Sequence, residues 1–175
     1  MGTLYLVRHG QASLGAQDYD NLSELGQKQS LRLGQYWRAK GLEFDAVLMG
    51  SLRRHAQTWV HLAQGGGYQL EPQIWPALNE YNADALIRAV QTQDSDRTDS
   101  PEAYRQHFRM LRAGLLLWAQ GEISPEGMPD YASFVSGVCS ALDHVREHFK
   151  GNVLIVSSGG PIATAISQVL GAPPE

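Results

Sequence analysis

Leu4-Tyr5-Leu6-Val7, followed at once by Arg8-His9-Gly10-Gln11, opens the chain with a short apolar run that ends in polar residues. An apolar, partly β-branched run that stops at a glycine predicts a strand buried on both faces. The His9 imidazole can attack phosphorus, and the Arg8 guanidinium can hold phosphate oxygens in a bidentate grip. Gly10 lets the backbone approach a ligand without a Cβ in the way. The stretch therefore predicts a phosphoryl-binding strand end.

The composition is that of an ordinary globular protein: 175 residues, 43% hydrophobic and 18% charged. The net charge of −4 argues against nucleic acid or an anionic membrane as the main partner. The apolar run at residues 4–7 is too short for a signal peptide, and no stretch is long enough to span a bilayer. Cys139 is the single cysteine, so no intrachain disulfide can form, which favours a reducing, cytoplasmic location. Composition makes no prediction about oligomeric state.

Apolar runs alternate with helical patterns along the chain. Strands are predicted over 4–7, 46–49, 69–75 and 153–156. Helices are predicted over about 23–40, 52–63, 83–91, 102–120 and 131–149, and from Pro161 onward. Gly65-Gly66-Gly67 is predicted to be a flexible break. The alternation predicts an α/β fold, a mostly parallel sheet flanked by helices. We expect one domain over 1–175, with residues 81–130 as a helical cap inserted over the C-terminal ends of the strands.

Three polar segments directly follow predicted strands, and they supply candidate phosphate ligands. They are Arg8-His9-Gly10, Ser51-Leu52-Arg53-Arg54 and Ser158-Gly159-Gly160. Ligands of open α/β sheets bind outside the carboxyl ends of the strands, so we expect these segments to converge. Arg54 can add a second cation, and the N–H groups after Gly159 can bind an anion at a helix start. Nearby arginines should also keep His9 neutral, as a nucleophile must be.

A leaving alkoxide needs a proton, so a carboxylic acid with a raised pKa should lie near the phosphate ligands. Glu80, in Leu78-Asn79-Glu80, is the best candidate because it follows a strand-like segment. His144 and His148 have a spacing that can bind metal, but no third ligand is apparent, and a solvated helix face is the favoured interpretation.

Four blocks of the chain, in order, resemble the histidine phosphatase (phosphoglycerate mutase-like) superfamily. They are Leu6-Val7-Arg8-His9-Gly10-Gln11, Leu22-Ser23-Glu24-Leu25-Gly26, Ser51-Leu52-Arg53-Arg54-His55-Ala56-Gln57-Thr58 and Leu78-Asn79-Glu80. The resemblance implies that His9 is the phosphorylated nucleophile and that Arg8 and Arg54 bind the phosphate. It also implies that Glu80 is the proton donor and that Gln11 lies near the substrate. Such chemistry needs no metal or organic cofactor.

The chain departs from the family pattern at Ser158, where the family usually has a second histidine. Serine is shorter and cannot carry positive charge. Losing such a donor without replacement would cost about 10²–10³ in rate. Ser158 Oγ, a bound water or another histidine from the insertion could compensate. The ending Gly171-Ala172-Pro173-Pro174-Glu175 is a second departure, because relatives commonly continue with another strand; we expect a shortened sheet edge or a truncated sequence.

These observations predict a phosphatase that hydrolyses a phosphomonoester through a phosphohistidine on His9. Its substrate would be a small phosphorylated metabolite or a phosphorylated protein side chain. Ser158 keeps open the alternative of a degenerate phosphate- or phosphoester-binding protein that is weak or inactive in catalysis. A phosphoglycerate-type mutase is the less favoured variant, since it must protect the phosphoenzyme from water.

Overall fold

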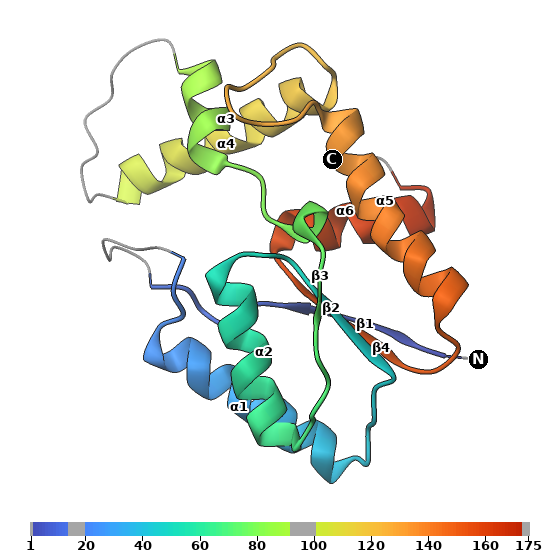
Figure 1. Ribbon diagram of the computed structural model, residues 1–175. Coiled ribbons are helices and arrows are strands. Elements are labelled where there is room, and N and C mark those ends of the chain that lie inside the picture. The colour runs from blue at the N-terminus through green and yellow to red at the C-terminus, as the bar shows by residue number, and fades with distance from the viewer. Residues whose placement is uncertain (1, 14–19, 92–100, 173–175) are drawn as a thin grey trace.

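A computed structural model describes residues 2–13, 20–91 and 101–172, which form layers of helices and strands (Figure 1). The strands are β1 (Leu4–Arg8), β2 (Ala46–Met49), β3 (Gln73–Ile74) and β4 (Val153–Ser157). The helices are α1 (Glu24–Ala39), α2 (Arg53–Gly66), α3 (Ala83–Val90), α4 (Pro101–Ala119), α5 (Tyr131–His148) and α6 (Gly159–Leu170), with a 3₁₀ turn η1 (Pro76–Leu78).

All strand pairs in the described sheet are parallel, and the strand order is β1-β4-β2-β3. The predicted α/β fold with a parallel sheet is thus confirmed. Arg8 pairs with Ser157, and Met49 pairs with Val156. The strands therefore end level with one another, and the residues that follow them emerge at a single edge.

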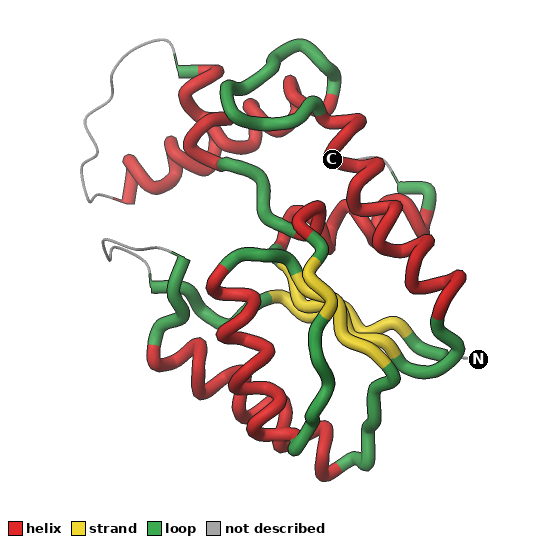
Figure 2. Tube along the Cα trace, in the orientation of Figure 1, coloured by secondary structure: helices red, strands yellow, loops and turns green. Residues whose placement is uncertain are grey.

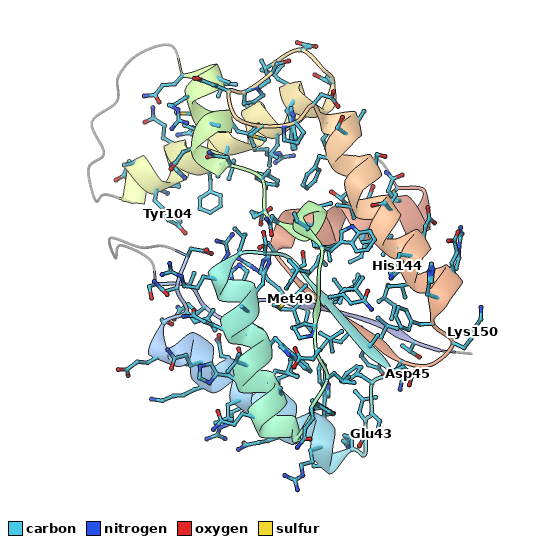
Figure 3. The ribbon with its side chains drawn as sticks, in the orientation of Figure 1. Glu43, Asp45, Met49, Tyr104, His144 and Lys150 are labelled. Carbon is cyan, nitrogen blue, oxygen red and sulfur yellow. The ribbon has the colours of Figure 1, made fainter. Side chains whose placement is uncertain are left out.

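Helices cover both faces of the sheet, as a parallel sheet requires. Figure 2 shows the yellow strands between α1 and α2 on one side and α5 and α6 on the other. Trp37 and Leu62 bury the first face together with Met49, which Figure 3 labels in the interior. Ala141 and Val145 of α5 pack on the second face. The alternate side chains of β2 and β4 divide between these two cores.

The prediction of a flexible break at residues 65–67 is wrong. Helix α2 continues through Gly66 and ends at Gly67, whose φ of +73° suits a glycine at a helix C-terminus. A Cβ on Gly65 would stand 2.1 Å from a backbone carbonyl oxygen of α1, and one on Gly34 would stand 2.0 Å from a carbonyl oxygen of α2. These glycines let the two helix backbones touch.

The third strand is much shorter than the predicted 69–75. Only Gln73 and Ile74 pair with β2. Pro72 directly precedes them and has no N–H to donate to a ladder, which accounts for the late start of the pairing.

Helices α3 and α4 pack against each other beyond the strand ends, at the top of Figure 1. Leu86 of α3, Trp118 of α4 and Phe134 of α5 share a buried cluster there. Both α3 and α4 fall within residues 81–130, whose treatment as an inserted cap stays a prediction. Among the residues described, no helix has the length and apolar character needed to cross a bilayer.

Candidate active site at the strand ends

The segment that follows β1 is fixed by backbone hydrogen bonds to two other elements. The His9 N–H donates to the Ser157 carbonyl at 2.9 Å, at the end of β4. The Gly10 N–H donates to Thr58 Oγ1 of α2 at 3.1 Å. Thr58 in turn donates to the Arg54 carbonyl at 2.7 Å. The histidine is therefore held in a set position between β4 and α2.

The His9 ring is arranged to be neutral with a free lone pair on Nε2. Its Nδ1 lies 2.7 Å from the Gly10 carbonyl oxygen, which can only accept, so this hydrogen bond requires the proton on Nδ1. Burial lowers the pKa of His9, and the nearby charges of Arg54 and Arg8 lower it further, although the bond to Gly10 opposes them. The neutral form therefore predominates near pH 7.

Arg54 lies in the first turn of α2 with its side chain buried. Its Nη1 donates to Asp20 Oδ1 at 2.7 Å. The other Asp20 oxygen accepts the Arg53 N–H at 2.8 Å, whereas the N-cap residue Leu52 has no side chain that can cap the helix. Asp20 thus caps α2 and steadies the guanidinium. Asp20 could not be predicted from the sequence, because it lies in an irregular segment with no spacing signal.

Arg8 and Glu80 approach the first turn of α6 from two directions. A Cβ built on Gly159 would stand 4.0 Å from Arg8 Nε and 3.8 Å from Glu80 Oε2. The two side chains therefore meet beside the same backbone, although they lie more than 70 residues apart in the sequence.

Glu80 is seated at the start of α6. The Gly160 N–H donates to its Oε1 at 3.1 Å and to its Oε2 at 3.2 Å. A Cβ on Gly160 would come within 2.2 Å of Oε1, so only glycine leaves room for the carboxylate. Burial raises the pKa of Glu80, while the bond from Gly160 and the charges of Arg54 and Arg8 oppose the rise. The carboxyl group keeps its proton to a higher pH than an exposed glutamate.

Ser158 is fully buried at the end of β4, and its Oγ lies 2.7 Å from Nε2 of His55. His55 is also fully buried, and its ring centroid is 5.8 Å from that of His9. Burial, followed by the charges of Arg54 and His9, lowers the pKa of His55 to about 3. No role for His55 was predicted from the sequence, although its place next to Arg54 is a usable signal. It comes from α2 and not from the insertion.

Gln11 is the one predicted ligand that turns toward a different partner. Its Oε1 accepts from Ser23 Oγ at 2.9 Å, and its carbonyl accepts the Ser23 N–H at 2.9 Å. The side chain therefore lies over the N-terminus of α1. The other predicted site residues gather at the strand ends; they are Arg8, His9, Arg54, Glu80, Ser158 and Gly159.

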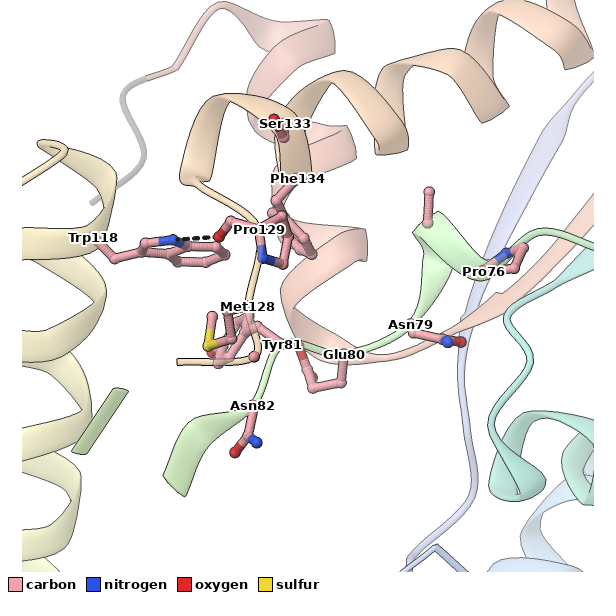
Figure 4. A pocket seen from close by; sticks show the side chains of 12 residues that line it. Pro76, Asn79, Glu80, Tyr81, Asn82, Trp118, Met128, Pro129, Ser133 and Phe134 are labelled. Atoms are coloured by element: carbon pink, nitrogen blue, oxygen red, sulfur yellow. Dashed lines mark hydrogen bonds between the residues drawn. The ribbon is translucent and has the colours of Figure 1, made fainter. Parts of the chain in front are cut away.

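A pocket of about 270 Å³ lies beside Glu80, between the segment after η1 and the helices α4 and α5 (Figure 4). Its walls include Tyr81, Trp118, Met128 and Phe134. The Trp118 indole N–H donates to the Pro129 carbonyl at 3.1 Å and is thereby satisfied. The walls therefore offer mainly apolar and aromatic contacts.

No group of three or more His, Cys, Asp or Glu side chains is placed to hold a metal ion within the described ranges. His144, labelled on α5 in Figure 3, stacks on His148 with 4.3 Å between ring centroids. Its Nε2 is 3.1 Å from Gln73 Oε1. These two histidines are thus engaged with each other and with β3.

Comparison with known sequences identifies one family. The sequence model of the histidine phosphatase superfamily (branch 1) matches residues 4–175. Among curated proteins, the Broad-specificity phosphatase YOR283W of Saccharomyces cerevisiae is 33% identical over 61 residues, which is 31% of this chain. The match spans 26% of that relative's length, about a quarter of it.

Comparison with solved structures supports the fold. The mycobacterial glucosyl-3-phosphoglycerate phosphatase Rv2419c superposes with a TM-score of 0.66 at 20% identity, over 97% of this chain and 80% of that one. The alpha-ribazole phosphatase from Shigella flexneri superposes with a TM-score of 0.63 at 23% identity, over 98% and 81%. At such identities the likeness concerns the fold.

Proposed function

Because this chain belongs to the histidine phosphatase superfamily, we propose that it hydrolyses a phosphomonoester through a phosphohistidine on His9. The observation that carries the proposal is the meeting of His9 with two arginines and a protonatable carboxyl group at one edge of the sheet. The charges of Arg54 and Arg8 are close enough to shift the pKa values of both His9 and Glu80. A phosphoryl group needs this combination of nucleophile, cations and acid.

In the first step His9 Nε2 attacks phosphorus. The N–P bond forms as the bond from phosphorus to the leaving oxygen breaks, and Glu80 gives its proton to that oxygen. Arg8 and Arg54 hold the phosphoryl oxygens, with Ser158 and the Gly159 N–H as further donors. In the second step water attacks phosphorus, the N–P bond breaks, and Glu80 takes the proton from the water. No metal or organic cofactor takes part.

The pocket beside Glu80 supports a place for the leaving group. Its volume of about 270 Å³ suits a small organic group, and its aromatic walls favour one with an apolar face. We therefore favour a small phosphorylated metabolite over a phosphorylated protein side chain. Gln11 would reach the substrate only after leaving its hydrogen bond with Ser23.

The test compares the wild-type protein with His9→Ala on an aryl phosphate from pH 5 to 8, with His61→Ala as the matched control. His61 lies farther along α2, with no part in the proposed site. We expect hydrolysis by the wild type and the control but not by His9→Ala. We likewise expect a covalent phosphoenzyme that is labile to acid in the wild type and the control but not in His9→Ala. Equal activity in wild type and His9→Ala would overturn the proposal.

One observation favours a second candidate, a binding protein that holds phosphate without turnover. Ser158 carries no charge, and the low pKa of the neighbouring His55, about 3, leaves that imidazole neutral. The phosphate site thus has two cationic side chains, Arg8 and Arg54, whereas the family pattern places a histidine that could carry a third positive charge at the position of Ser158. Calorimetric binding of inorganic phosphate, with no hydrolysis from pH 5 to 8, would favour this candidate.

A further inference from the structure

His55 is a buried polar side chain that takes no part in the two proposed steps, phosphoryl transfer to His9 and hydrolysis of the phosphohistidine. It is fully buried, and its Nε2 makes a 2.7 Å contact with Ser158 Oγ. Burying an imidazole is costly unless its polar atoms are engaged, and an apolar side chain would fill the same space without that cost. Nε2 is the one ring nitrogen of His55 that makes a hydrogen bond within the described part of the chain, since Nδ1 is buried without a partner there. The hydrogen bond to Ser158 is therefore the feature that distinguishes His55 from a packing residue.

Ser158 is equally unusual for its place in the fold. It is the N-cap residue of α6, yet its side chain makes no capping hydrogen bond. A serine at this position ordinarily accepts an N–H from the first turn of the helix. Here the hydroxyl turns to His55, so helix capping does not explain it.

The protein also leaves space for the ring. A Cβ on Gly50 would lie 2.4 Å from His55 Nδ1, so a larger residue after β2 would displace the imidazole. The end of β2, the first turn of α2 and the end of β4 together enclose the ring. The ring centroid lies 5.8 Å from that of His9, at the side of the proposed nucleophile.

We propose that His55 is a positioning residue that holds the Ser158 hydroxyl toward the phosphoryl group on His9, so that a buried imidazole from α2 and the hydroxyl of the α6 N-cap residue act as one neutral donor. The proposal rests on the proposed function. The proposal takes the tautomer of His55 that carries its proton on Nε2, which donates to Ser158 Oγ across the 2.7 Å contact. The Ser158 O–H is then free to donate to a phosphoryl oxygen, which can only accept. No proton is transferred between the two side chains. The low pKa of His55 agrees with an imidazole that stays neutral throughout.

The first test measures kcat and KM on an aryl phosphate for His55→Leu, Ser158→Ala and the double variant. Each single change should lower kcat about 10–100-fold, with KM changed less than about 3-fold, as for a lost transition-state donor. The double variant should be no worse than the poorer single variant, because both changes remove the same hydroxyl contact. His55→Gln has an amide that can still donate to Ser158. Its log kcat should therefore lie at least about halfway from that of His55→Leu to that of the wild type. His61→Leu is the control on the same helix.

A folded His55→Leu protein with wild-type kcat would overturn the proposal, and so would multiplying effects in the double variant. If His55→Leu fails to fold, Ser158→Ala decides, since its wild-type kcat would equally overturn it. Activity that survives in His9→Ala would instead remove the proposed function and this inference with it. Activity that depends on His9 but not on Ser158 would remove the inference alone.

An exchange variant gives the sharpest result. His55→Ala combined with Ser158→His moves the imidazole from α2 to the position after β4. We expect at least about 10-fold more activity than in His55→Ala alone, because the imidazole can again donate a hydrogen bond beside His9. An exchange variant as inactive as His55→Ala would overturn the claim that the two side chains share one task.

Discussion

The strand-end site (Arg8, His9, Arg54, Glu80 and Ser158) and the neighbouring pocket beside Glu80 are built in opposite ways. At the strand ends, charged and hydrogen-bonding groups are attached to β1, α2, β4 and α6, and backbone hydrogen bonds fix their positions. In the pocket beside Glu80, the walls are mainly aromatic and apolar side chains from η1 and the segment after it, from α4 and α5, and from the loop between these two helices. Under the proposed function, the first region acts on a phosphoryl group common to many substrates, while the second selects what is attached to it.

The largest effect should come from Arg54→Ala, which removes a cation from the strand-end site. We expect kcat to fall about 10²–10³-fold for every phosphomonoester. Asp20 would lose its 2.7 Å partner, so the free energy of unfolding should also fall by about 2 kcal/mol. Steady-state kinetics on several substrates and urea denaturation measure the two effects. The exposed neighbour Arg53→Ala is the control, and a loss confined to one substrate would contradict the division of roles.

The next effect concerns Glu80→Gln, which keeps an acceptor for the Gly160 N–H but cannot give a proton. Alkyl phosphates need a protonated leaving group, so their kcat should fall about 10²-fold, whereas activated aryl phosphates should lose far less.

The pH dependence of the wild type follows from the raised pKa of Glu80. The acid form is lost as the pH rises through that pKa, so alkyl phosphate hydrolysis should decline on the alkaline side. The Gln variant should lack this limb. Profiles of kcat for glycerol phosphate from pH 5 to 9 measure this decline. If Glu80→Gln shows the same alkaline decline as the wild type, another group is the acid.

A smaller effect is expected in the pocket beside Glu80. Met128→Trp should fill part of the 270 Å³ pocket and lower kcat/KM for naphthyl phosphate about 10-fold, with little change for methyl phosphate. Met110→Trp, on α4 but not in the pocket wall, is the matched control. Equal losses on both substrates would mean that the pocket beside Glu80 does not receive the leaving group.

The smallest effect on catalysis should come from Gly65→Ala, because Gly65 belongs neither to the strand-end site nor to the pocket beside Glu80. The added Cβ would lie 2.1 Å from an α1 carbonyl oxygen, so the helices must move apart at a cost of about 1–3 kcal/mol in unfolding free energy. The folded fraction should retain wild-type kcat. Thermal unfolding of this variant beside the exposed neighbour Gln64→Ala measures the effect, and equal stability of the two would contradict close helix contact.

Much of the fold could be predicted because the signals are local. The buried strands at 46–49 and 153–156 have apolar runs closed by glycine or serine, and their parallel pairing follows from the alternation with helices. The meeting of Arg8, His9 and Arg54 follows from the same topology, since parallel strands end at one edge.

What could not be predicted depends on contacts between distant segments. The sequence around Gly65 predicted a flexible residue, because a local pattern does not reveal that Gly65 packs against the distant helix α1. His55 looked like an ordinary helix histidine because neither its burial nor its contact with Ser158 can be read from spacing. Asp20 was missed for the same reason, since its partner Arg54 lies 34 residues away.

The level register of β1 and β4 limits how this protein can change. Arg8 pairs with Ser157, and the N–H of the next residue, His9, donates to the Ser157 carbonyl. Swapping one apolar side chain for another inside these strands leaves that alignment intact, whereas inserting or deleting a single residue would turn the following side chains to the opposite face. The length of these strands therefore tolerates less change than the identity of their apolar residues. Insertions and deletions are better tolerated in the segments that connect the elements.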